Sequence, residues 1–219
     1  MFLLDLLLPQ RCTCCDLIVD ADELLCEECL QQINFCNEDF GTHNKLYRRL
    51  QLLFPLRNAF SLMEFEKESL SRKIIHELKY NGRERHGKFF AEWTSERLQF
   101  NEREKPTVIV GVPLHPKKKR KRGYNQLDLF NQILGERMKI PVDKEALIRT
   151  NFRRSQASKN KARREKTDQG FRLVKPLTHT HFLLTDDVCT TGNTLASCAW
   201  ELLKEPSNSV SILAIAHES

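Results

Sequence analysis

Three short apolar segments that alternate with helical patterns constrain the fold of this chain more than any other feature. Residues 107–113 (TVIVGVP), 181–187 (HFLLTDD) and 209–216 (SVSILAIA) have the pattern of strands that are buried on both faces. Apolar residues at helical spacing follow the first segment over about residues 125–138, and residues 191–205 separate the other two. This alternation predicts an α/β fold, in which helices cover both faces of a parallel sheet.

The chain of 219 residues is long enough for one sizeable core and a small accessory module. Residues 69–82 and 89–98 show helical spacing, whereas residues 37–57 show no clear period and are expected to be a linker. No stretch approaches the roughly 20 apolar residues of a membrane span, and the apolar start lacks the basic flank of a signal peptide. We therefore expect a cytoplasmic protein.

Six of the eight cysteines fall in the first 36 residues, which indicates one small metal module. Two CxxC pairs, separated by ten residues, have a spacing that fits one tetrahedral Zn²⁺, and their members are Cys12, Cys15, Cys26 and Cys29. Four thiolates would fill the coordination shell, so the site is expected to be structural. Cys14 and Cys36 are additional thiols, which leaves the choice of ligands open, and a loop of reduced cysteines is the competing interpretation.

Charge is distributed unevenly along the chain. Residues 1–50 carry four Lys/Arg against nine Asp/Glu, so the net charge of +6 arises entirely from residues 51–219. We expect residues 1–50 to form the metal module with its linker and residues 51–219 to form the sheet domain. The excess of positive charge in the second part predicts an anionic partner.

Six consecutive cations precede a tyrosine in the middle of the chain. They are Lys117, Lys118, Lys119, Arg120, Lys121 and Arg122, and Tyr124 follows them. A second basic tract lies within residues 153–166. Such a run can bind the phosphates of single-stranded nucleic acid, with Tyr124 as a stacking residue. A solvated surface loop is the competing interpretation.

An apolar strand that runs into two acids and a hydroxyl-rich loop is the sharpest sign of a binding site. Residues 183–194 read LLTDDVCTTGNT and place Asp186 and Asp187 at the end of the strand. The N–H groups of such a loop and of the following helix bind a monophosphate, while neighbouring carboxylates accept hydrogen bonds from a vicinal diol. The segment predicts a site for a ribose 5-phosphate. Ordinary turns and helix caps are the competing interpretation.

The motifs GxxxxGK[ST], GxGxxG, HExxH and GxSxG do not occur in the sequence. The acid pair followed by TTGNT resembles the phosphoribosyl pyrophosphate (PRPP) motif of type I phosphoribosyltransferases. The whole chain resembles the ComF (ComFC/GntX) family of competence proteins through LLDLLLPQRCTCC with LCEEC, HELKYNGRERHGK, VGVPLHPKKKRKRGYNQ and LLTDDVCTTGNTL. Asp16 stands where that family usually has a glycine after the first CxxC pair.

The resemblance implies a type I phosphoribosyltransferase-like domain with a zinc module, and Mg²⁺ that accompanies PRPP. It implies that Asp186 and Asp187 hold the ribose hydroxyls. The residues implied for the 5-phosphate are Thr190, Thr191, Gly192, Asn193 and Thr194, and those for the pyrophosphate are Val112, Pro113 and Leu114. Lys79, Tyr80 and Gly82 match the KYxG segment of the family, to which the sequence assigns no role; a helix C-cap is the competing interpretation.

The resemblance implies binding of PRPP and single-stranded DNA during the handling of internalised DNA in natural transformation. A competence helicase or other DNA-processing proteins are the candidate partners. The alternative is an active phosphoribosyltransferase that acts on a nucleobase in nucleotide salvage, with Mg²⁺ and positioning driving the displacement of pyrophosphate. A non-catalytic scaffold is a third possibility, which the intact acids and TTGNT disfavour. Because the sequence shows no base-specific pocket, it assigns no catalytic residue and leaves open whether the chain is an enzyme.

Overall fold

The computed structural model describes residues 9–66, 68–79, 86–115, 117, 120, 123–150 and 170–218. The strands are β1 (Ala59–Phe65), β2 (Val108–Gly111), β3 (Leu147–Arg149), β4 (Phe171–Leu173), β5 (His181–Cys189) and β6 (Ser209–Glu218). The helices are α2 (Glu27–Gln31), α3 (Lys45–Leu50), α4 (Leu70–Lys79), α5 (His86–Arg97), α7 (Leu127–Met138) and α8 (Asn193–Leu202). None of the helices in these ranges is long and apolar enough to cross a membrane.

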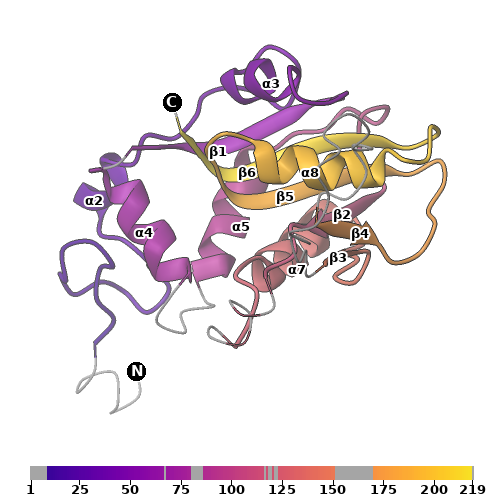
Figure 1. Cartoon of the computed structure of the whole chain (residues 1–219). Helices are drawn as coiled ribbons and strands as arrows, with labels where there is room; N and C mark the ends of the chain where they lie inside the picture. Colours follow the sequence, from indigo (N-terminus) through magenta and orange to yellow (C-terminus); the bar gives the residue numbers. More distant parts are fainter. Residues whose placement is uncertain are drawn as a thin grey trace, which may run out of the picture.

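A parallel sheet with the strand order β1-β6-β5-β2 forms the centre of the molecule (Figure 1). Its register pairs Ile109 of β2 with Leu183 of β5, and Leu184 of β5 with Ile212 of β6. Strands in such a sheet are covered on both faces, which is why their sequences are apolar without alternation. The predicted fold class, a parallel sheet flanked by helices, is confirmed.

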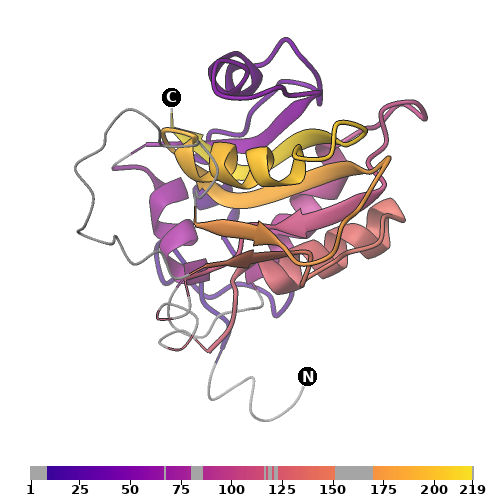
Figure 2. The same ribbon diagram turned by 45° about the vertical axis from the view of Figure 1, so that its right-hand side comes forward.

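Each face of the sheet has its own apolar core. Helices α4, α5 and α7 cover one face, where Leu78 and Phe130 pack in one cluster with Leu183. Helix α8 covers the opposite face, where Leu195 packs in a second cluster with Leu184, together with α3 and the β3-β4 hairpin (Figure 2). Adjacent residues of β5 therefore point into different cores, as the two-residue period of a strand requires.

The structure also contains elements that the sequence did not predict. Helices α4, α5, α7 and α8 and strands β2, β5 and β6 lie where the apolar spacing predicts them. In contrast, α3 lies within the expected linker, where the Asn44 side chain caps it by accepting the N–H of Tyr47 at 2.7 Å. Strand β1 and the β3-β4 hairpin were also missed. A three-residue strand is too short to show a period, and β1 is defined by its pairing with the distant β6.

The cysteine-containing segment packs directly on the sheet domain. Leu24, Leu25 and Ile33 belong to the same apolar cluster as Ile74 and Leu78 of α4. Isolated antiparallel bridges and a backbone hydrogen bond of 2.9 Å also join the segment to β1. The apolar cluster is continuous across the position at which the sequence places a linker.

Candidate functional site

Four cysteine sulfurs converge at the N-terminal end of the described chain. The Sγ atoms of Cys12, Cys15, Cys26 and Cys29 all lie within 4.8 Å of one another, and those of Cys15 and Cys26 are 3.6 Å apart. A tetrahedral zinc with Zn–S bonds of about 2.3 Å requires sulfurs roughly 3.8 Å apart, so the group fits this ion. Cys14 and Cys36 lie outside this group, so the geometry favours Cys12, Cys15, Cys26 and Cys29 as the ligands.

The backbone around the first CxxC pair is arranged to hold the sulfurs. The N–H of Cys14 donates to Sγ of Cys12 at 3.4 Å, and the carbonyl of Cys14 accepts a hydrogen bond from Lys73 of α4 at 2.6 Å. Asp16 adopts a left-handed conformation with φ of 64°. Aspartate is one of the residues that tolerate this region, so it can replace the glycine that the resemblance leads one to expect there.

The two acids of the second candidate site, at the end of β5, point to opposite faces of the sheet. Asp187 is only 6% exposed and faces α4 and α7, where Lys79 Nζ lies 2.8 Å from its Oδ1 and the Gln126 amide donates to its Oδ2. Asp186 is partly exposed on the α8 face, and its Oδ1 accepts the N–H of Asp187 at 2.9 Å. The two carboxylates are therefore in different environments although they are adjacent in sequence.

Several groups around the acid pair act on the ionisation of Asp186. Burial, and then the adjacent Asp187 carboxylate, raise the pKa of Asp186 to about 8. The N–H of Asp187, the ammonium of Lys79 and the guanidinium of Arg149 act in the opposite direction and favour the ionised form. The pKa of Asp186 is therefore raised in the ligand-free protein, and a ligand that needs the carboxylate favours release of its proton.

The hydroxyl-rich loop after β5 is exposed to solvent and is held in place by α3. Thr190, Thr191, Asn193 and Thr194 are exposed, and α8 begins at Asn193. Gly192 is buried with φ of 78°, and a Cβ at this position would meet the side chains of Leu50 and Leu53.

Arg49 of α3 holds the same loop by a hydrogen bond of 3.0 Å from its guanidinium to the carbonyl of Thr190. The loop thus presents hydroxyls and backbone N–H groups at a helix N-terminus, while α3 buttresses its inner side.

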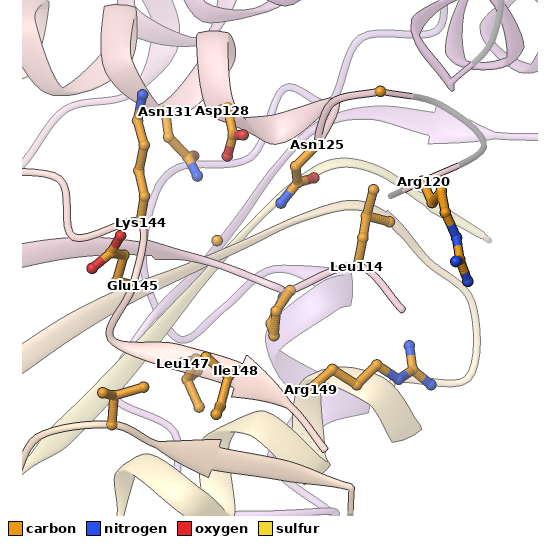
Figure 3. Close-up of a pocket in the computed structure, with 14 residues that line it drawn as sticks. Leu114, Arg120, Asn125, Asp128, Asn131, Lys144, Glu145, Leu147, Ile148 and Arg149 are labelled. Carbon is orange, nitrogen blue, oxygen red and sulfur yellow. The ribbon is translucent and has the colours of Figure 1, made fainter. Parts of the chain in front are cut away.

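The turn after β2 lies beside a pocket of about 970 Å³ (Figure 3). Val112 is buried and its N–H donates to Thr185 of β5 at 2.9 Å, while Pro113 and Leu114 line the pocket. The guanidinium groups of Arg120 and Arg149 lie at the same end of this pocket. Arg149 is also close enough to Asp186 to favour its ionised form, although neither acid of the pair lines the pocket.

Only part of the basic run falls within the described residues. Lys117 and Arg120 are exposed, as a binding surface requires. Tyr124, which we expected to stack on bases, donates its hydroxyl to the carbonyl of Leu78 at 3.1 Å and is partly buried. The other members of the run, and two residues of the KYxG segment, lie outside the described residues: Lys118, Lys119, Lys121, Arg122, Tyr80 and Gly82.

Four residues that contact the site were not identified from the sequence. Lys79 was noted only as part of the KYxG segment, and Gln126 only as the end of the GYNQ string. Arg49 and Arg149 lie in α3 and β3, which were not predicted at all. These side chains reach the site from distant parts of the chain, so no local spacing could have revealed them.

Comparisons with known proteins match the cysteine segment to a family model and a larger part of the chain to solved structures. The family model described as "Double zinc ribbon domain" matches residues 3–41, which contain the four converging cysteines. Among solved structures, adenine phosphoribosyltransferase from Trypanosoma brucei is similar with a TM-score of 0.39 and 10% identity, covering 73% of this chain and 83% of that one. Hypoxanthine phosphoribosyltransferase from Staphylococcus aureus has a TM-score of 0.31 and 18% identity, covering 68% and 71%.

Curated relatives extend over most of the chain. The DNA utilization protein YhgH of Escherichia coli K12 is 28% identical over 208 residues, which cover 92% of this chain and 87% of the relative. Competence protein ComFC of Streptococcus pneumoniae is 27% identical, covering 78% and 64%. Competence protein F of Haemophilus influenzae is 34% identical over 94 residues, or 41% of each chain. The chain is thus a homologue of the YhgH and ComF-type proteins, as the resemblance in its sequence predicts, and it has a zinc ribbon at residues 3–41 and a parallel sheet flanked by helices.

Proposed function

We propose that this chain binds PRPP at the end of β5 and single-stranded DNA through the adjacent cations, in the handling of internalised DNA during natural transformation. The names of its relatives, a DNA utilization protein and two competence proteins, support the DNA-related role. One observation carries the PRPP site. An acid pair near the carboxyl end of β5 is followed by an exposed hydroxyl loop at a helix N-terminus, and the neighbouring strand β2 ends at a pocket that Arg120, Lys144 and Arg149 line together with Asp128 and Glu145.

Each part of the ligand has a chemical counterpart in this arrangement. The acid pair is the counterpart of the ribose hydroxyls, and the loop from Thr190 to Thr194 donates to the 5-phosphate. The turn from Val112 to Leu114 supplies backbone groups to the diphosphate, and Arg120 and Arg149 neutralise its charge. These contacts bind and orient the ligand, and none of them requires an acid or a base.

The donor atoms of the site fit a Mg²⁺ ion that arrives with the ligand. Magnesium prefers six oxygen ligands, keeps several waters and binds phosphates with one or two carboxylates. Lys79 and Gln126 already engage both oxygens of Asp187, so the phosphates and hydroxyls of the ligand would supply most of the oxygens around the ion. When bound, the ion would neutralise diphosphate charge.

Cations around the pocket support binding of single-stranded DNA. Arg120, Lys144 and Arg149 line the pocket together with Asp128 and Glu145, and Lys117 is exposed three residues before Arg120. Long basic side chains of this kind neutralise phosphates without reading bases, so the affinity is expected to depend on salt and little on sequence.

Calorimetric titration with PRPP and with ribose 5-phosphate, with and without Mg²⁺, tests the phosphoribosyl site. We expect binding in the parent and a loss of about 10- to 150-fold in Asp186→Asn, since a charge-assisted hydrogen bond contributes roughly 1.5 to 3 kcal/mol. Glu136→Gln, which alters an exposed carboxylate on α7, is the control. A parent that binds neither ligand would overturn the proposal, and product formation with one of a panel of nucleobases would identify an active transferase instead.

A further inference from the structure

Lys79 is the last residue of α4, and its ammonium forms an ion pair with the second acid of the pair at the end of β5. Its Nζ lies 2.8 Å from Oδ1 of Asp187, and the side chains are 23% and 8% exposed. The amide of Gln126, just before α7, donates to the other oxygen. Protein groups from two helical regions therefore engage both oxygens of Asp187, although neither group is near Asp187 in sequence.

Asp186 is bound differently. Among the described residues its carboxylate accepts only the N–H of Asp187, at 2.9 Å, and it lies on the partly exposed α8 face. A ribose hydroxyl that approaches from the exposed loop can reach this carboxylate without breaking an existing ion pair. To reach Asp187 it would have to displace Lys79 or Gln126.

The charged groups around the acid pair show that Lys79 balances the negative charge of Asp187. Asp187, Lys79 and Arg149 act on the ionisation of Asp186, while burial raises the pKa of the nearby Cys189 thiol to about 12 and keeps it neutral. The thiol of Cys198 on α8 also has a raised pKa because of burial. Without Lys79, Asp187 would be a buried carboxylate with an uncompensated charge next to a second carboxyl, and two such groups resist ionising together.

We propose that Lys79 is a positioning residue of the phosphoribosyl site: it fixes and neutralises Asp187, so that Asp186 is the carboxylate that receives the ribose hydroxyls. This inference rests on the proposed function and divides the roles within the acid pair. It also gives a role to the lysine of the KYxG segment.

Titration of the acid pair in the ligand-free protein tests the role of Lys79. Carboxyl carbon NMR of the parent, Lys79→Met and Lys79→Arg is compared with Lys45→Met, which breaks the ion pair of 2.6 Å between Lys45 and Glu64 elsewhere on the protein. We expect the midpoint of Asp186 to rise by about one pH unit or more in Lys79→Met, to recover in Lys79→Arg and to stay at the parental value in Lys45→Met. A parental midpoint in Lys79→Met would overturn the role of Lys79.

Binding of ribose 5-phosphate tests the division between the two acids. The double variant Lys79→Met with Asp187→Asn removes both charges together and avoids an unpaired buried carboxylate, so it keeps the fold if the single variant does not. We expect this double variant to retain more than a tenth of the parental affinity, whereas Asp186→Asn loses more than tenfold.

Two results of the binding experiment would contradict these proposals. Binding by the double variant as weak as that of Asp186→Asn would overturn the division of roles. Absence of binding in the parent would overturn the proposed function and the ribose assignment with it, whereas the NMR titration reports on Lys79 without any ligand.

Discussion

The zinc ribbon and the acid pair are both sites built from a few side chains, but they are assembled in different ways. All four candidate ligands lie between Cys12 and Cys29, the first pair around a turn and the second pair at the start of α2. The acid pair interacts with Lys79 of α4 and Arg149 of β3, and Arg49 of α3 holds the loop that follows the pair, so the site draws on both sides of the sheet. A local site can be recognised from spacing, whereas a site assembled from distant elements cannot.

The difference has a physical cause. A thiolate group needs only the right distances to bind a metal, and the metal itself then stabilises the turns that carry the ligands. A carboxylate at the end of a buried strand needs countercharges or hydrogen-bond donors, and only the fold can bring these to it. We therefore expect substitutions in the ribbon to have local structural effects, and substitutions near the acid pair to couple several elements.

The largest effect is expected when one zinc ligand is removed. Cys26→Ser should release the metal and increase hydrogen exchange in residues 9–36 while β5 and β6 stay protected, because structural zinc contributes roughly 10–16 kcal/mol in small zinc-binding peptides. Elemental analysis and hydrogen exchange measure the two outcomes. Cys14→Ser is the matched control, since Cys14 lies outside the group, and it should keep one zinc per chain. Retention of zinc in Cys26→Ser would refute the ligand set.

The second-largest effect is a loss of stability when the contact between α3 and the loop after β5 is disturbed. Gly192→Ala should destabilise the protein by about 2–4 kcal/mol, because a side chain with φ of 78° is strained and the new Cβ would meet Leu50 and Leu53. Urea unfolding measures this change. Gly123 has a similar φ of 83° with no atom within 4 Å of an added Cβ, so Gly123→Ala should cost only about 1–2 kcal/mol. Equal losses in the two variants would show that α3 does not buttress the loop.

A smaller effect concerns the pH dependence of stability. The folded-state pKa of Asp186, about 8, lies above its unfolded value of 3.8, so its contribution is fully present below pH 3.8 and is lost as the pH rises towards 8. Asp186→Asn removes this loss. The variant should match the parent near pH 4 and be more stable by about 1 kcal/mol or more at pH 8. Urea unfolding at both pH values tests this, and parallel pH profiles would contradict the raised pKa.

The smallest effect concerns DNA binding. If the cations contact phosphates, replacing Arg120 and Arg149 with Gln should reduce the slope of log K against log salt by roughly 1.4, at about 0.7 per contact for single strands. Fluorescence anisotropy with a labelled single strand measures the slope. Lys45→Gln, which alters an exposed cation outside this region, should leave it unchanged. An unchanged slope in the double variant would favour a solvated surface for this region.

Much of the fold could be predicted because it follows from local patterns. Residues 107–113 and 181–187 are apolar on both faces because β2 and β5 are buried on both faces, so their sequences specify strands. The spacing of Ile74 and Leu78 likewise specifies α4. Strand β1 was missed because its pairing partner β6 lies far away in the sequence, and β3 and β4 were missed because three residues are too few to show a period.

The sequence by itself determined the α/β class, the four candidate zinc ligands and the strand that ends in two acids, since each depends on spacing within a short segment. Only the tertiary structure decided which acid is already engaged. Consecutive residues of a strand face opposite sides of a sheet, and the helices on each side supply different partners. Lys79 and Gln126 reach Asp187 on one face, while Asp186 is partly exposed on the other. The two adjacent aspartates therefore differ in their partners and in their exposure to solvent.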